Sequence, residues 1–168
     1  MRRAIVLIAV ILTALLLQTT VFPELTLLGI KPELLYLVTV VFAALRGPEE
    51  GALVGFVGGL AQDFMLNTPK GITALTLTIL GYTVGLARQY ITSPSPLLPA
   101  ILVAIGTAAG VAFHQGVGFL IGEEDAPFGY LAKVVLITAI YGAILTPIFY
   151  PVLRRAAAAT HAGRVVRF

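Results

Sequence analysis

Long apolar runs that contain almost no charge constrain this chain more than any other feature. A helix needs roughly 20 predominantly apolar residues to cross the hydrocarbon core of a bilayer. Only 11% of the residues are charged, whereas soluble domains have about 25%. The sequence therefore predicts an all-α integral membrane protein. The apolar runs lie at about 4–22, 34–45, 51–62, 71–87, 97–122 and 134–153.

The two short runs, 34–45 and 51–62, leave an alternative open. Segments of this length are also compatible with a re-entrant or buried helix. We interpret both as membrane crossings, because Glu33 stands at the edge of the first and the second extends past Asp63 to Leu66. The prediction is a single transmembrane domain over residues 1–168, folded as a six-helix bundle with a basic tail at 154–168. Its helices are expected at about 4–22, 32–45, 49–66, 71–88, 97–122 and 129–153.

Prolines and the first residues refine this plan. Pro32 suits the first turn of the second helix, and Pro147 and Pro151 are expected to kink or end the sixth. The start Met-Arg-Arg followed by an apolar run resembles a signal peptide, but the run is too long and no A-x-A-like site follows it. We therefore expect a retained first helix.

The basic residues indicate which way the helices cross. With the N-terminus inside, six crossings place eight arginines on the cytoplasmic side and three lysines on or near the outer side, which together make the 11 basic residues. This is the sense of the positive-inside bias. The chain is thus expected to have both termini on the cytoplasmic side of the membrane. The basic residues that give the chain its net charge of +3 are then expected to contact lipid headgroups and not nucleic acid.

Glycines recur in steps of four in several predicted helices. The third helix carries Gly51, Gly55 and Gly59, followed at the next step by Asp63, and the fourth carries Gly81 and Gly85. Small residues four apart share one helix face and let the backbones of neighbouring helices approach. Two interpretations remain: the ridges form an internal seam of the bundle, or one of them faces a partner protein.

Asp63 and His114 are the polar residues that most need an explanation. Asp63 is predicted near the end of the third helix, where the free N–H groups that begin the next helix would accept an anion. Lys70 is a second candidate partner, and a role as an ion or substrate ligand is the alternative. His114 lies in the fifth helix among glycines, where an interhelical hydrogen bond or a proton relay would suit it.

Signatures of catalysis are missing from the sequence. It has no cysteine, no H-E-x-x-H, no G-x-S-x-G and no Walker-type loop. Glu49 and Glu50 stand beside Arg46 and are interpreted as a solvated loop. We predict a protein that is not an enzyme, with no catalytic residue, no metal site and no cofactor.

The segment 32–85 carries an ordered series of short motifs, which are Pro32-Glu33-Leu34-Leu35, Ala44-Leu45-Arg46-Gly47-Pro48, Gly51, Gly55-Phe56, Gly59-Leu60, Asp63, Pro69-x-Gly71 and Gly81-Tyr82-x-x-Gly85. With these spacings it resembles the MreD family, the rod shape-determining proteins of bacteria, and this resemblance implies a place in the bacterial inner membrane. Many members have Pro-Asp where this chain has Pro32-Glu33, and a small apolar residue where it has Gln62. The motif residues expected to bind a partner or to maintain the structure are Pro32, Arg46, Gly51, Gly55, Gly59, Asp63, Pro69, Gly71, Gly81, Tyr82 and Gly85.

The resemblance implies a non-catalytic scaffold of the cell-elongation complex. Members associate with MreC and, through it, with MreB, the RodA glycosyltransferase and its penicillin-binding transpeptidase, and so support side-wall peptidoglycan synthesis and rod shape. The family is also similar in architecture to the substrate-binding subunits of energy-coupling-factor transporters. That similarity frames the alternative, a vitamin-like small-molecule binder in which Asp63, Asn67, Lys70 and Tyr82 form part of a pocket.

Overall fold

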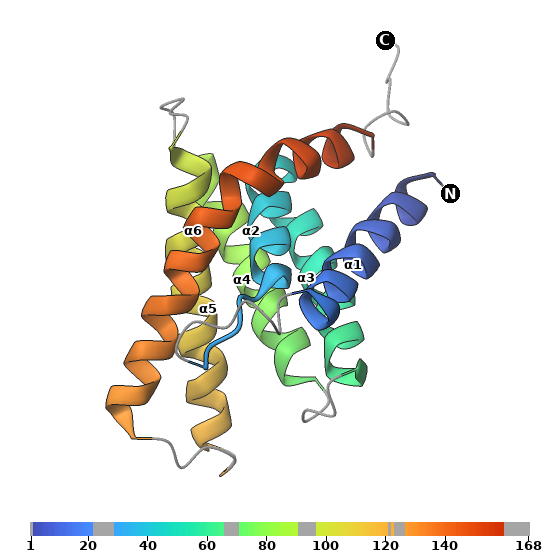
Figure 1. The fold of residues 1–168 in the computed structure, drawn as a ribbon. Coiled ribbons are helices and arrows are strands. Elements are labelled where there is room, and N and C mark those ends of the chain that lie inside the picture. Colours follow the sequence, from blue (N-terminus) through green and yellow to red (C-terminus); the bar gives the residue numbers. More distant parts are fainter. Residues whose placement is uncertain are drawn as a thin grey trace.

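The computed structural model is all-helical and describes residues 2–21, 29–65, 71–90, 97–120, 122 and 127–159. These residues form six helices, which Figure 1 shows packed side by side as a bundle. The helices are α1 (Arg2–Thr20), α2 (Leu34–Arg46), α3 (Pro48–Met65), α4 (Ile72–Gln89), α5 (Leu98–Leu120) and α6 (Phe128–Ala159).

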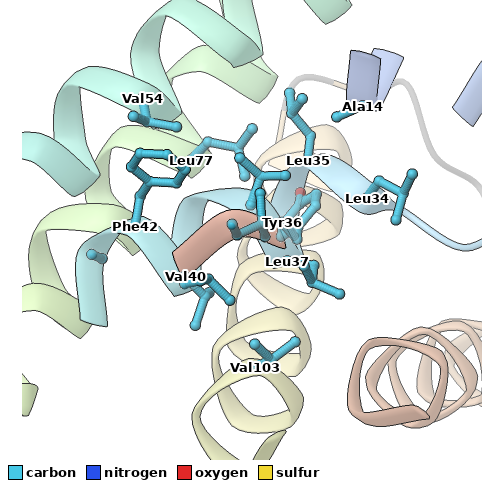
Figure 2. Close-up of a cluster of buried hydrophobic side chains, with 14 of the residues drawn as sticks. Ala14, Leu34, Leu35, Tyr36, Leu37, Val40, Phe42, Val54, Leu77 and Val103 are labelled. Carbon is cyan, nitrogen blue, oxygen red and sulfur yellow. The ribbon is translucent and has the colours of Figure 1, made fainter. Parts of the chain in front are cut away.

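Helix α2 lies at the centre of the bundle. It packs against each of the other five helices, and every residue from Leu34 to Ala44 is buried. Figure 2 shows its side chains between Val54 and Leu77 on one side and Val103 of α5 on the other. A helix covered on all sides is apolar all round, which explains why the run at 34–45 shows no polar face.

Helix α2 is also the shortest of the six helices described. Its 13 residues span about 20 Å at 1.5 Å per residue, less than the roughly 30 Å of hydrocarbon. Glu33 has an extended backbone at the N-cap, so the helix starts after Pro32 and not at it. The sequence-based expectation that Pro32 lies in the first turn is therefore wrong. Pro32 itself is buried in the extended segment that leads into α2.

A sharp turn between Arg46 and Glu49 joins α2 to α3. Gly47 adopts a positive φ of 95°, which disfavours other residues, and its N–H donates to the carbonyl of Ala43 at 2.9 Å. Pro48 is the first residue of α3, a position where its missing N–H is not needed. The chain therefore reverses direction over very few residues, and α3 runs back along α2.

The outward faces of the bundle are apolar. Three helices are long and apolar enough to cross a membrane, namely Arg3–Thr20, Leu98–Leu120 and Gly129–Ala159, and Leu34–Arg46 is apolar but shorter. Large aliphatic side chains face outward at steps of three or four along α1 and α6, a pattern typical of helices that meet lipid. These exposed residues are Ile5, Ile8, Leu12, Leu16, Leu136, Ile140, Ile144, Ile148 and Val152. The protein is thus a helical membrane protein.

Helix α6 continues past both of its prolines. Pro147 and Pro151 lie inside the helix, which ends at Ala159 and not near 153. Figure 1 shows its last part, in red, turning away from the axis of the preceding turns, as expected where proline lacks an N–H and crowds the preceding turn. The start of the predicted tail is therefore helical, with Leu153 and Ala157 buried. Residues 160–168 lie outside the described part.

Candidate functional site: the hairpin of α3 and α4

Helices α3 and α4 approach each other backbone to backbone. A Cβ added at Gly51 would lie 2.6 Å from the carbonyl oxygen of Gly81, closer than any real contact. A Cβ at Gly55 would overlap the carbonyl of Leu77. The backbones can approach this closely only because the contact positions lack side chains.

The same contact extends over the whole length of the pair. At one end a Cβ on Gly59 would meet the backbone of Ala74, and at the other a Cβ on Gly85 would meet Pro48. We call this contact, formed by Gly51, Gly55 and Gly59 with Gly81 and Gly85, the glycine seam. Of the two interpretations of the ridges on α3 and α4, the structure supports the internal seam.

Two glycines of α5 pack against side chains of the central helix α2. A Cβ at Gly106 would lie 2.8 Å from Cγ2 of Val40, and one at Gly110 would lie 2.6 Å from Cε1 of Tyr36. These glycines therefore form shallow depressions for α2 side chains and not a backbone contact. His114 follows one turn later and is half-buried.

Asp63 closes the hairpin at the far end of the seam. Its side chain is 0% exposed, and its Oδ2 accepts hydrogen bonds from the N–H of Gly71 at 2.9 Å and of Ala74 at 3.2 Å. Both donors belong to the start of α4, where helical N–H groups lack internal partners and the helix dipole favours negative charge. The sequence predicted this use of Asp63. The other candidate partner, Lys70, lies outside the described residues, as do Asn67 and Pro69.

Gly71 is required by its backbone conformation and not by crowding. It is the N-cap of α4 with a φ of 109°, a region that side chains rarely adopt. Nothing lies within 4 Å of a Cβ added there. This φ brings the Gly71 N–H to Asp63, so the glycine and the carboxylate act as a unit.

A charged cluster holds the opposite end of the hairpin. Glu50 pairs with Arg3 of α1 and lies 3.7 Å from Arg46 of α2. The Arg46 and Glu50 side chains are only 14% and 12% exposed, so the interpretation of Glu49 and Glu50 as a solvated loop is wrong for Glu50. Both glutamates stand in the first turn of α3, where negative charge is favoured, and Glu50 connects α1, α2 and α3.

Apolar side chains cover the exposed side of the hairpin. Tyr82 is 48% exposed although it stands between two glycines of the seam. Comparable exposure is found at intervals of three or four on both helices, at positions that alternate with the glycines of the seam. We call this set the outer hairpin face: Leu53, Phe56, Val57, Leu75, Ile79 and Tyr82. The sequence analysis included Tyr82 but missed the other five, which could have been found as the apolar positions out of phase with the glycines.

A comparison with protein families identifies the kind of protein that this hairpin belongs to. The model described as rod shape-determining protein MreD matches residues 1–156. The chain belongs to the MreD family. The match extends well beyond the segment 32–85, on which the sequence resemblance rested. No curated protein and no solved structure matches the chain.

The hairpin thus belongs to a protein of a family that acts in determining rod shape. Asp63 and Tyr82 do not line either of two grooves, one of about 890 Å³ between α5 and α6 and one of about 420 Å³ between α1, α2 and α6. Asn67 and Lys70, the other two residues of the expected pocket, lie outside the described residues. Among the described residues, no three His, Cys, Asp or Glu side chains are grouped so that they could hold a metal ion.

Proposed function

We propose that this MreD-family protein is a non-catalytic scaffold of the bacterial cell-elongation complex. In this proposal it binds MreC in the inner membrane, and through MreC it supports RodA, its penicillin-binding transpeptidase and, indirectly, MreB. Its role is to hold these proteins together while side-wall peptidoglycan is made. Six crossings with both termini in the cytoplasm are part of the proposal.

The observation that carries the proposal is what the motif residues do. Those on α3 and α4 hold the two helices in close contact, and none of the motif residues that the structure describes lines either groove. The seam brings the backbones of α3 and α4 into contact, and Asp63 fixes the start of α4. Such a pair presents its outer hairpin face as a constant surface. Aromatic and aliphatic side chains there, such as Phe56 and Tyr82, suit a membrane-embedded partner helix, whose affinity in lipid comes from close packing.

The arrangement of basic residues supports the proposed orientation. The contact of Glu50 with Arg3 and the contact of Gly85 with Pro48 bring the starts of α1 and α3 and the end of α4 together. Arg3, Arg46 and Arg88 are thus gathered at one end of the bundle. The positive-inside bias then places that end in the cytoplasm.

A partner analysis tests the proposal. The tagged chain would be purified from its native membranes in mild detergent and its co-purifying proteins identified by mass spectrometry. We expect stoichiometric MreC, with or without RodA and its transpeptidase. An ATPase-bearing transporter module in place of MreC would contradict the scaffold and favour a substrate-binding subunit, for which the groove between α5 and α6 would be the place to look.

A further inference from the structure

A groove between α1, α2 and α6 lies apart from the hairpin. Its volume is about 420 Å³, within the range of about 300–1,000 Å³ typical of small-molecule sites. Apolar side chains such as Val10, Val38 and Phe149 line it. The one hydroxyl in the lining, on Thr13, already donates to the carbonyl of Ala9 at 2.7 Å. The groove therefore offers an occupant apolar contact and no free polar side-chain group.

One end of this groove is positively charged. Val6 of α1 and Leu153 of α6 line that end, and the next residues along α6 are Arg154 and Arg155. Both arginines are exposed, and neither forms an ion pair in the described part of the chain. Arg3, one turn before Val6, is held by Glu50. Two free cations thus stand where the apolar groove meets the end of the bundle that carries the arginines.

The last part of α6 provides this combination. The helix contains Pro147 and Pro151, continues to Ala159, and its last part turns away from the axis of the preceding turns (Figure 1). Leu153 on this part lines the groove, and the two arginines follow it along the helix. Leu153 and Ala157 are buried, one helical turn apart, so packing holds the bent part against the bundle.

The lining of the groove suits a thin apolar occupant. A helix with its side chains is about 10 Å across. An extended acyl chain is much thinner and needs no hydrogen bond. Because lipid chains are already in an apolar solvent, the groove holds the chain without selecting one lipid over another, and selectivity must come from the arginines and an anionic headgroup.

We propose that this groove is a lipid site: it holds one acyl chain of an anionic phospholipid, whose phosphate lies at Arg154 and Arg155. The inference is independent of the proposed scaffold, since it uses no residue of the hairpin.

Native mass spectrometry of the full chain in detergent tests the site, with phosphatidylglycerol and phosphatidylcholine as probes. We expect one phosphatidylglycerol to be retained in preference to phosphatidylcholine. In the double variant Arg154→Gln, Arg155→Gln we expect its apparent affinity to fall on the order of ten-fold or more. Arg88→Gln is the matched control, because it removes an exposed arginine at the same end of the bundle, on α4 and away from the groove.

A second pair of variants tests the acyl chain separately from the charge. Thr13→Phe places a large side chain in the groove, because Thr13 lines it. Leu12→Phe introduces the same side chain at an exposed position of α1 that does not line the groove. Retention should be lost in the first and kept in the second. Equal retention of both lipids by the wild-type chain, or equal retention by the Thr13 and Leu12 variants, would overturn the proposal.

Discussion

Asp63 is the residue on which sequence reasoning and structure agree most closely. A carboxylate near the end of an apolar helix is unfavourable unless donors surround it, and this requirement pointed to the start of the next helix. The structure supplies Gly71 and Ala74 as the donors. The charged cluster around Glu50 could not be derived in the same way. That Glu50 is only 12% exposed depends on how α1 packs against α3, which no local pattern in Arg46-Gly47-Pro48-Glu49-Glu50 reveals.

Replacing Asp63 tests whether its hydrogen bonds to the start of α4 stabilise the hairpin. In Asp63→Ala the N–H groups of Gly71 and Ala74 lose their acceptor in a buried site, which costs about 1–3 kcal/mol for each unsatisfied group. We expect the variant to insert into the membrane but to melt at a lower temperature in detergent, and to co-purify less MreC. Asp63→Asn keeps an acceptor oxygen and should lie between the two. A melting temperature of Asp63→Ala equal to that of the wild type would show that these hydrogen bonds do not stabilise the hairpin.

At the scale of helices, the sequence predicted six elements and the glycine ridges but not their surroundings. The short run at 34–45 was interpreted as a crossing, but the sequence did not reveal that α2 is the central helix, buried on all sides. Length and composition cannot distinguish a central helix from one that faces lipid, because both give a continuous apolar run. The effect of the prolines of α6 could not be predicted from local rules either. Neighbouring helices stabilise a proline-containing membrane helix, so the helix bends and continues where local rules allowed an end.

The glycine seam can be tested with a matched pair of substitutions. In Gly55→Ala the new Cβ would overlap the carbonyl of Leu77, so α3 and α4 must move apart, and overpacking of this kind costs about 1–3 kcal/mol. Gly116 of α5 has nothing within 4 Å of an added Cβ, so Gly116→Ala should be neutral or slightly stabilising. Thermal unfolding in detergent measures both. If both variants melted like the wild type, the close backbone contact would not contribute to stability.

At the scale of the whole molecule, the chain combines a closely packed hairpin with an apolar surface. Hydropathy and charge were enough to predict a helical membrane protein, and the motif series was enough to point to the MreD family before the family match confirmed it. The outer hairpin face was largely missed, because an exposed apolar residue in a membrane protein gives no signal that separates lipid from protein contact. Only the position of α3 and α4 relative to the other helices marks their exposed side as a distinct surface.

Photocrosslinking in growing cells tests the central claim, that the outer hairpin face binds the partner. A photoreactive amino acid would replace Tyr82 on the outer hairpin face or Ile140 on the outward face of α6, two positions that are 48% and 50% exposed. We predict an adduct with MreC from position 82 and none from position 140. An adduct from position 140 alone, or no MreC adduct from position 82 in cells that remain rod-shaped, would contradict the account.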